Sequence, residues 1–123
     1  MTEIDRLKPA ARYSEVVIHN GTAYLSGQVP DNTSADIRGQ TEEVLGMIDS
    51  LLAEAGSDKS RLLSAQIFLR DIADIEVMNS VWDAWVAPGC APARATVQAR
   101  LVDPAWLVEI VVTAGIADKI ADK

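Results

Sequence analysis

Short runs of β-branched and aromatic residues alternate along this chain with longer stretches in which apolar residues recur at helical spacing. Residues 13–18 and 22–29 predict two strands, because β-forming residues dominate both runs. The Asn20-Gly21 pair between them accommodates positive φ and predicts a hairpin turn. From Ala35 the apolar side chains fall on one helical face until Gly56, which suits a helix C-terminus. The chain is therefore predicted to begin as a β-hairpin followed by an amphipathic helix.

The second half predicts further elements, and then a tail over 118–123 that is expected to fray. In order, these elements are a strand over 62–69, a helix capped by Asp71 or Asp74 and ended by Pro88, and two strands over 92–97 and 107–114 that form a second hairpin. Trp82 and Trp85 are three residues apart on the apolar side of the helix, which favours core packing. The order β-β-α-β-α-β-β fits one domain over residues 1–123.

Both helices are amphipathic, and right-handed crossovers place them on the same face of a mixed sheet. This arrangement is an α+β fold. The opposite face would then meet water, yet neither alternating set of side chains in 62–69 or 107–114 is consistently polar. We therefore expect other copies of the chain to cover that face in an obligate oligomer.

The composition restricts the classes of function. The formal net charge is −7, which argues against sequence-independent nucleic-acid binding and against docking on an anionic membrane. Cys90 is the only cysteine, so neither an internal disulfide nor a cysteine-based zinc site is expected. No apolar segment is long enough to span a bilayer, and we expect a cytoplasmic protein. A small anionic ligand remains compatible, because one arginine can dominate a local pocket.

Two charged residues stand inside the last two predicted strands. Arg94 lies near the start of one strand, and Glu109 lies within the next. Charged groups are rarely buried unless they are paired or bind a ligand, and a guanidinium binds a carboxylate through two parallel hydrogen bonds. From these two residues alone, an ion pair within or between subunits is the simpler interpretation, and ligand binding is the alternative.

A series of short motifs, in one register from about residue 12 to residue 114, resembles the reactive intermediate deaminase family (RidA, also called YjgF-like). The motifs are Tyr13-Ser14, Leu25-Ser26-Gly27-Gln28, Gln40-Thr41, Glu54-Ala55-Gly56, Phe68-Leu69-Arg70-Asp71, Met78-Asn79, Pro92-Ala93-Arg94 and Val108-Glu109-Ile110. The resemblance implies a chorismate-mutase-like fold assembled as a homotrimer with clefts between neighbouring subunits. It also implies hydrolysis of enamine and imine acids, such as 2-aminoacrylate or 2-iminobutanoate, to 2-oxo acids and ammonia, with neither metal nor organic cofactor.

The resemblance also implies roles for individual residues. Arg94 matches the arginine that binds the substrate carboxylate, and Glu109 matches the acid of the water or proton-transfer step. The pocket-lining positions matched are Tyr13, Ser26, Gly27, Asn79 and, where many members have cysteine, Thr96. A threonine forms hydrogen bonds but supplies no thiolate.

Each of these positions also has a structural interpretation. Glu109 either acts on the water or holds the Arg94 guanidinium in place. Tyr13 can equally pack the hairpin, Asn79 can be a surface amide, and Ser26 with Gly27 can mark a bulge. For the whole protein, the main alternative to a deaminase is a trimer that binds 2-oxo acids without turning them over.

Overall fold

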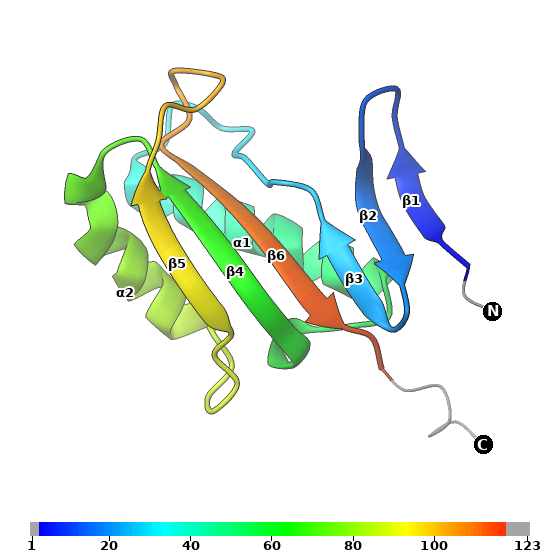
Figure 1. The fold of residues 1–123 in the computed structure, drawn as a ribbon. Coiled ribbons are helices and arrows are strands. Elements are labelled where there is room, and N and C mark those ends of the chain that lie inside the picture. The colour runs from blue at the N-terminus through cyan, green and yellow to red at the C-terminus, as the bar shows by residue number, and fades with distance from the viewer. Residues whose placement is uncertain (1–2, 118–123) are drawn as a thin grey trace.

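The computed structural model describes residues 3–117, and the tail predicted to fray lies outside them. Two helices cover one face of a six-stranded mixed sheet with the strand order β1-β2-β3-β6-β4-β5 (Figure 1). The elements are β1 Asp5–Pro9, β2 Ser14–His19, β3 Thr22–Leu25, α1 Ile37–Glu54, β4 Leu62–Leu69, α2 Ile75–Trp85, β5 Ala93–Gln98 and β6 Val108–Gly115. Short 3-10 turns at Lys59–Arg61 and Ile72–Asp74 precede β4 and α2. This architecture confirms the predicted α+β class.

Helix α1 begins and ends where the sequence signals indicate. The Asp36 side chain accepts a hydrogen bond from the backbone N–H of Gly39 at 2.9 Å, which satisfies one of the free amide groups of the first turn. Gly56 follows the helix with a φ of +80°, as expected for a residue that ends a helix in the left-handed region. The apolar face between these points is buried against the sheet, with Leu45, Ile48 and Leu52 in the core.

The prediction missed β1. This strand pairs antiparallel with β2 at the edge of the sheet, and four of its five residues are exposed. Its sequence, Asp5-Arg-Leu-Lys-Pro9, therefore lacks the alternating apolar pattern from which strands are recognised. Strand β3 is also shorter than predicted, because the chain leaves the sheet after Leu25 and returns only through an isolated bridge between Gln28 and Ile110.

The two C-terminal strands do not form the predicted hairpin. Strand β4 lies between them, pairing parallel with β5 and antiparallel with β6. The connection between β5 and β6 therefore passes over the end of β4 (Figure 1). Adjacency in sequence favoured a hairpin, but the crossover through α2 places β5 at the edge of the sheet and leaves the central position for β6.

The face of the sheet opposite the helices carries apolar side chains. Tyr24 and Val97 are 48% and 46% exposed there, and the strand registers place Phe68 and Val111 on the same face. Uncovered apolar surface of this kind marks an interaction site more often than a free surface. Among the described residues, neither helix is long and apolar enough to cross a membrane.

Candidate functional site

A cavity of about 830 Å³ opens where β3 diverges from β6. The start of β2, the loop after β3, helix α1 and the β5–β6 connection enclose it. The sequence-predicted residues Tyr13, Ser26, Gly27 and Glu109 all line this cavity. The structure thus brings together four positions from opposite ends of the chain, between residue 13 and residue 109.

The Glu109 carboxylate lies directly against the backbone of Gly27. A Cβ at position 27 would overlap Oε2 of Glu109 and would lie 3.0 Å from its Cδ. The neighbouring backbones are fixed by a reciprocal pair of hydrogen bonds, in which Gln28 N–H donates to the Ile110 carbonyl at 2.9 Å and Ile110 N–H donates to the Gln28 carbonyl at 3.1 Å. The missing side chain of Gly27 therefore leaves the space that the Glu109 carboxylate occupies, which explains a glycine here more directly than a bulge does.

Burial raises the pKa of Glu109 above its usual value, because removal from water disfavours the charged form. Among the described residues, no side chain forms an ion pair or a hydrogen bond with this carboxylate. A partly desolvated carboxylate without a protein partner is suited to accept a proton from a bound water or to return one to a leaving group.

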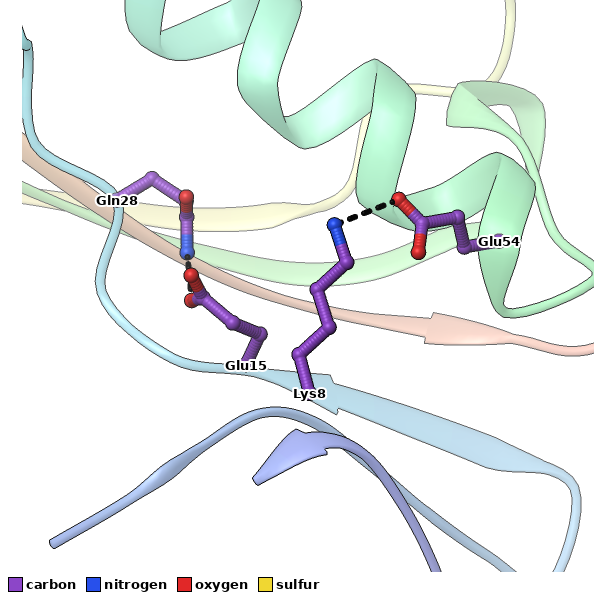
Figure 2. A network of polar contacts seen from close by, with 4 residues as sticks. All are labelled: Lys8, Glu15, Gln28 and Glu54. Atoms are coloured by element: carbon purple, nitrogen blue, oxygen red, sulfur yellow. Dashed lines mark hydrogen bonds and ion pairs between the residues drawn. The ribbon is translucent and has the colours of Figure 1, made fainter. Parts of the chain in front are cut away.

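A second carboxylate, Glu15, is held by hydrogen bonds on the same cavity wall. Its Oε1 accepts from Ser26 Oγ at 2.9 Å and from Gln28 Nε2 at 3.3 Å, the second of which Figure 2 shows. The Ser26 N–H also donates to the Glu15 carbonyl at 2.9 Å. Sequence reasoning missed the roles of Glu15 and Gln28, although Gln28 belongs to a quoted motif. Gln28 is 7% exposed, and the amide of a buried glutamine requires partners of this kind.

The rim of the cavity is formed in part by an ion pair between β1 and α1. Lys8 Nζ lies 3.1 Å from Oε2 of Glu54, and Figure 2 shows the lysine reaching from the strand to the helix. Both side chains are about half exposed, so the pair contributes little to stability. The pair instead affects the charge of the cavity. Among residues 3–117, Lys8 is the one basic residue in the cavity lining, whereas four carboxylates line it, those of Glu15, Asp31, Glu54 and Glu109.

The other predicted residues lie away from this cavity, on or beside the edge strand β5. Arg94 pairs with Ala65, whose side chain is buried under the helices, and its guanidinium carbon lies 5.3 Å from the centre of the Trp82 ring. Glu109 instead pairs with Phe68, on the face without helices. Arg94 and Glu109 therefore lie on opposite faces, with β4 between their strands. An ion pair between them within one chain, which was one interpretation of the sequence, is not formed in the described part of the chain.

Asn79 and Thr96 share the edge occupied by Arg94. At the end of β5, the side chain of Gln98 accepts a hydrogen bond at 2.9 Å from the N–H of Ile72, which lies just before α2. Near the start of β5, Arg94 lies over Trp82, which is near the end of α2. Helix α2 therefore runs antiparallel to β5. Thr96 and Asn79 fall between these two contacts. Thr96 Oγ1 and Asn79 Oδ1 are buried and have no hydrogen-bond partner among the described residues. Unpaired buried polar atoms are rare in folded proteins.

Among residues 3–117, no group of three or more His, Cys, Asp or Glu side chains is arranged to hold a metal ion. Cys90, the only cysteine, is partly buried. The chemical groups of the candidate site are thus carboxylates, an arginine and backbone groups.

Comparison with known proteins now adds to this geometry. A family model described as endoribonuclease L-PSP matches residues 3–116. The chain belongs to the L-PSP (YjgF) family. The resemblance inferred from the sequence motifs is thereby confirmed at the level of the family.

Several L-PSP relatives match almost the whole chain. A RutC family protein of Haemophilus ducreyi is 51% identical, with 92% of this chain and 97% of the relative covered. The RutC family protein YoaB of Escherichia coli is 50% identical, with 92% and 98% covered. The crystal structure of a Neisseria meningitidis member of the YjgF family is 51% identical, covers 94% of this chain and 97% of its own, and superimposes with a TM-score of 0.90.

Proposed function

We propose that this L-PSP family member is a homotrimeric deaminase that hydrolyses enamine and imine acids to 2-oxo acids and ammonia in a cleft between two subunits. The observation that carries the proposal is the division of the site. The pocket around Glu109 has carboxylates but no arginine in its lining, whereas Arg94 lies at the far edge of the sheet. A substrate that carries both a carboxylate and an imine requires both halves.

One chain cannot bring both halves to one small substrate. Neighbouring strands are about 4.8 Å apart, so β5 and β6 are separated by about 10 Å across β4. The two side chains also extend from opposite faces of the sheet. A second copy that packs on the apolar face without helices would bring its edge strand β5, with Arg94, to the mouth of the cavity. Rotational symmetry then makes all the clefts of a trimer equivalent.

The proposed chemistry uses groups that the chain supplies. The Arg94 guanidinium of one subunit holds the substrate carboxylate through two hydrogen bonds, which fixes the imine carbon near Glu109 of its neighbour. The carboxylates that line the cavity favour the protonated iminium form, which is the better electrophile. A backbone carbonyl at Cys90 or Ala91 orients the attacking water.

Proton transfer completes the reaction. As the water oxygen bonds to the iminium carbon, Glu109 accepts one of its protons, and a tetrahedral carbinolamine forms. Glu109 then returns this proton to the amino nitrogen, and the C–N bond breaks to release ammonia. The hydroxyl group gives its proton to the Glu109 carboxylate as its oxygen becomes the 2-oxo group, and this proton then passes to the ammonia, which leaves as ammonium. The carboxyl pKa raised by burial supports both steps, because it brings the acid closer to the pKa at which proton transfer in each direction is efficient.

The family name suggests an endoribonuclease, but the surface argues against RNA as a substrate. The net charge is −7, and carboxylates outnumber basic groups in the cavity. The second candidate function is binding of 2-oxo acids without turnover. It is favoured by Thr96 at the position where many family members have cysteine. We place either activity in the cytoplasm, because the single cysteine indicates no disulfide framework.

The test is turnover of 2-aminoacrylate generated in place by a serine or threonine dehydratase. The deaminase should accelerate the appearance of the 2-oxo acid, and Arg94→Ala should abolish the acceleration. Arg94→Lys should retain only a small part of it, because an ammonium cannot form the paired hydrogen bonds of a guanidinium. Arg100→Ala, at an exposed position after β5, is the matched control.

The result separates the two candidates. Acceleration that is lost in Arg94→Ala trimers supports the deaminase. Wild-type trimers that bind 2-oxobutanoate but do not accelerate the appearance of the 2-oxo acid from 2-aminoacrylate would favour the binding function. Full acceleration by Arg94→Ala would remove the basis of both.

A further inference from the structure

Among the residues that the structure describes, the Arg94 guanidinium has an aromatic partner and no anionic one. Its central carbon lies 5.3 Å from the centre of the Trp82 ring. Within residues 3–117 it takes part in no ion pair. A cation over an aromatic face is held by the negative potential of the ring, and tryptophan provides the strongest face of this kind.

Trp82 is itself fixed in place. The side chain is 4% exposed and belongs to the hydrophobic core. The Trp85 ring packs against it with centroids 5.4 Å apart. The Trp82 backbone lies in the last full turn of α2, where its carbonyl accepts from the N–H of Val86 at 2.8 Å. Trp82 is thus a rigid surface under a side chain that is otherwise exposed on an edge strand.

We propose that Trp82 is the positioning residue for Arg94, holding the guanidinium so that its hydrogen-bonding edge faces the substrate carboxylate in the neighbouring cleft. The inference rests on the proposed function. A carboxylate partner would occupy the same N–H donors and would neutralise the charge that the substrate needs. An aromatic face orients the guanidinium while leaving its in-plane donors and its charge available.

The surroundings of Trp82 explain why an orienting surface is needed. Asn79 lies one helical turn before Trp82, and its buried Oδ1 has no hydrogen-bond partner among the described residues. Thr96 Oγ1, two residues along β5 from Arg94, is in the same state. Without the tryptophan face, these two oxygen atoms would compete with the substrate carboxylate for the N–H groups of Arg94. Loss of the ring should therefore misdirect the guanidinium.

The test compares Trp82→Leu and Trp82→Phe with Lys59→Ala. Lys59 Nζ lies 5.4 Å from the centre of the Trp85 ring, outside the proposed site, so Lys59→Ala removes the other cation–aromatic contact found within residues 3–117 and leaves both tryptophans in place. Trp82→Leu should raise KM about tenfold with a much smaller change in kcat, because the lost interaction orients the carboxylate in the ground state and in the transition state alike. Trp82→Phe should recover most of the loss, and Lys59→Ala should match wild type.

Ligand binding separates positioning from a structural role. Trp82→Leu should weaken binding of 2-oxobutanoate about tenfold and leave binding of its uncharged amide unchanged, because only the former has the carboxylate that Arg94 holds. Equal weakening for both ligands would overturn the inference. If Trp82→Leu does not form trimers, tryptophans with increasing fluorination are placed at position 82 alone. Fluorination keeps the shape of the indole ring and weakens the negative potential of its face. KM should therefore rise with the degree of fluorination, and a constant KM would refute the inference.

The failure of this inference is distinguishable from that of the proposed function. If Arg94→Ala is inactive while Trp82→Leu behaves like wild type, Trp82 has no positioning role and the deaminase stands. If Arg94→Ala turns over substrate normally, the proposed function fails first.

Discussion

Replacement of Gly27 by alanine should separate activity from stability more cleanly than any other change in the cavity. The added Cβ would overlap Oε2 of Glu109 and lie 3.0 Å and 3.3 Å from its Cδ and Cγ. Carbon atoms in ordinary contact are about 3.5–4.0 Å apart, so the Glu109 side chain must move by about 1 Å at its carboxylate. Because the obstacle is the end of a flexible side chain rather than backbone, the move is available.

The two consequences differ in size. A methyl group accommodated by rotation of a neighbouring side chain costs at most about 1–3 kcal/mol of folding free energy, and the lower end applies where that side chain faces a cavity. A reacting group misplaced by about 1 Å costs about a hundredfold in rate. We therefore expect Gly27→Ala to form stable trimers and to lose about two orders of magnitude in kcat/KM for 2-aminoacrylate.

The assay is the coupled dehydratase reaction, with thermal unfolding measured on the same samples. Gly46→Ala is the control, because a Cβ there meets nothing within 4 Å. It lies inside α1, so it should keep full activity and raise the free energy of unfolding by about 0.5–1 kcal/mol. Wild-type kcat/KM in Gly27→Ala would show that the position of the Glu109 carboxylate does not matter to turnover, which would refute the reasoning.

Three further predictions concern charge. Burial raises the pKa of Glu109, so kcat/KM of the wild type should fall as the pH drops through that raised value, and Glu109→Gln should have low activity without this pH dependence. The folded state binds the Glu109 proton more tightly than the unfolded chain, so this group destabilises the fold as the pH rises above its unfolded pKa. Urea unfolding should therefore show Glu109→Gln to be more stable than wild type at neutral pH, with the difference disappearing in acid, and a less stable variant at neutral pH would contradict the pKa argument. Val97→Glu places a charge on the apolar face without helices and should yield monomers by light scattering, and intact trimers would show that this face is not the interface.

The local elements of this fold could be predicted from the sequence because their signals are local. The apolar repeat and the terminal glycine define α1, and the strand predicted over 62–69 is observed as β4. Strand β1 gives no such signal, because Leu7 is its only partly buried residue. The false hairpin of β5 and β6 has the opposite cause, since sheet order depends on non-local pairing that adjacent segments do not reveal.

The candidate site was predicted only in part, because its residues are recognisable in local motifs whereas their arrangement depends on non-local strand pairing. The motifs identified the residue types, and four of the predicted site residues, Tyr13, Ser26, Gly27 and Glu109, line one cavity. Which face each side chain occupies depends on register, and a shift of one residue would exchange the faces. The separation of Arg94 from Glu109 therefore emerged only with the strand pairing. Glu15 was missed because its role depends on Ser26 and Gln28, which reach it only after folding.

The central claim, that the two halves of the site come from different subunits, is tested most directly by mixed trimers. Arg94→Ala and Glu109→Gln chains, each inactive alone, are co-expressed with different affinity tags, and trimers that contain both chains are isolated. In a cyclic trimer of either composition, about one cleft in three pairs an intact Glu109 with an intact Arg94 from the next subunit. The account predicts that mixed trimers recover about a third of wild-type 2-aminoacrylate turnover. Mixed trimers as inactive as their parents would contradict it.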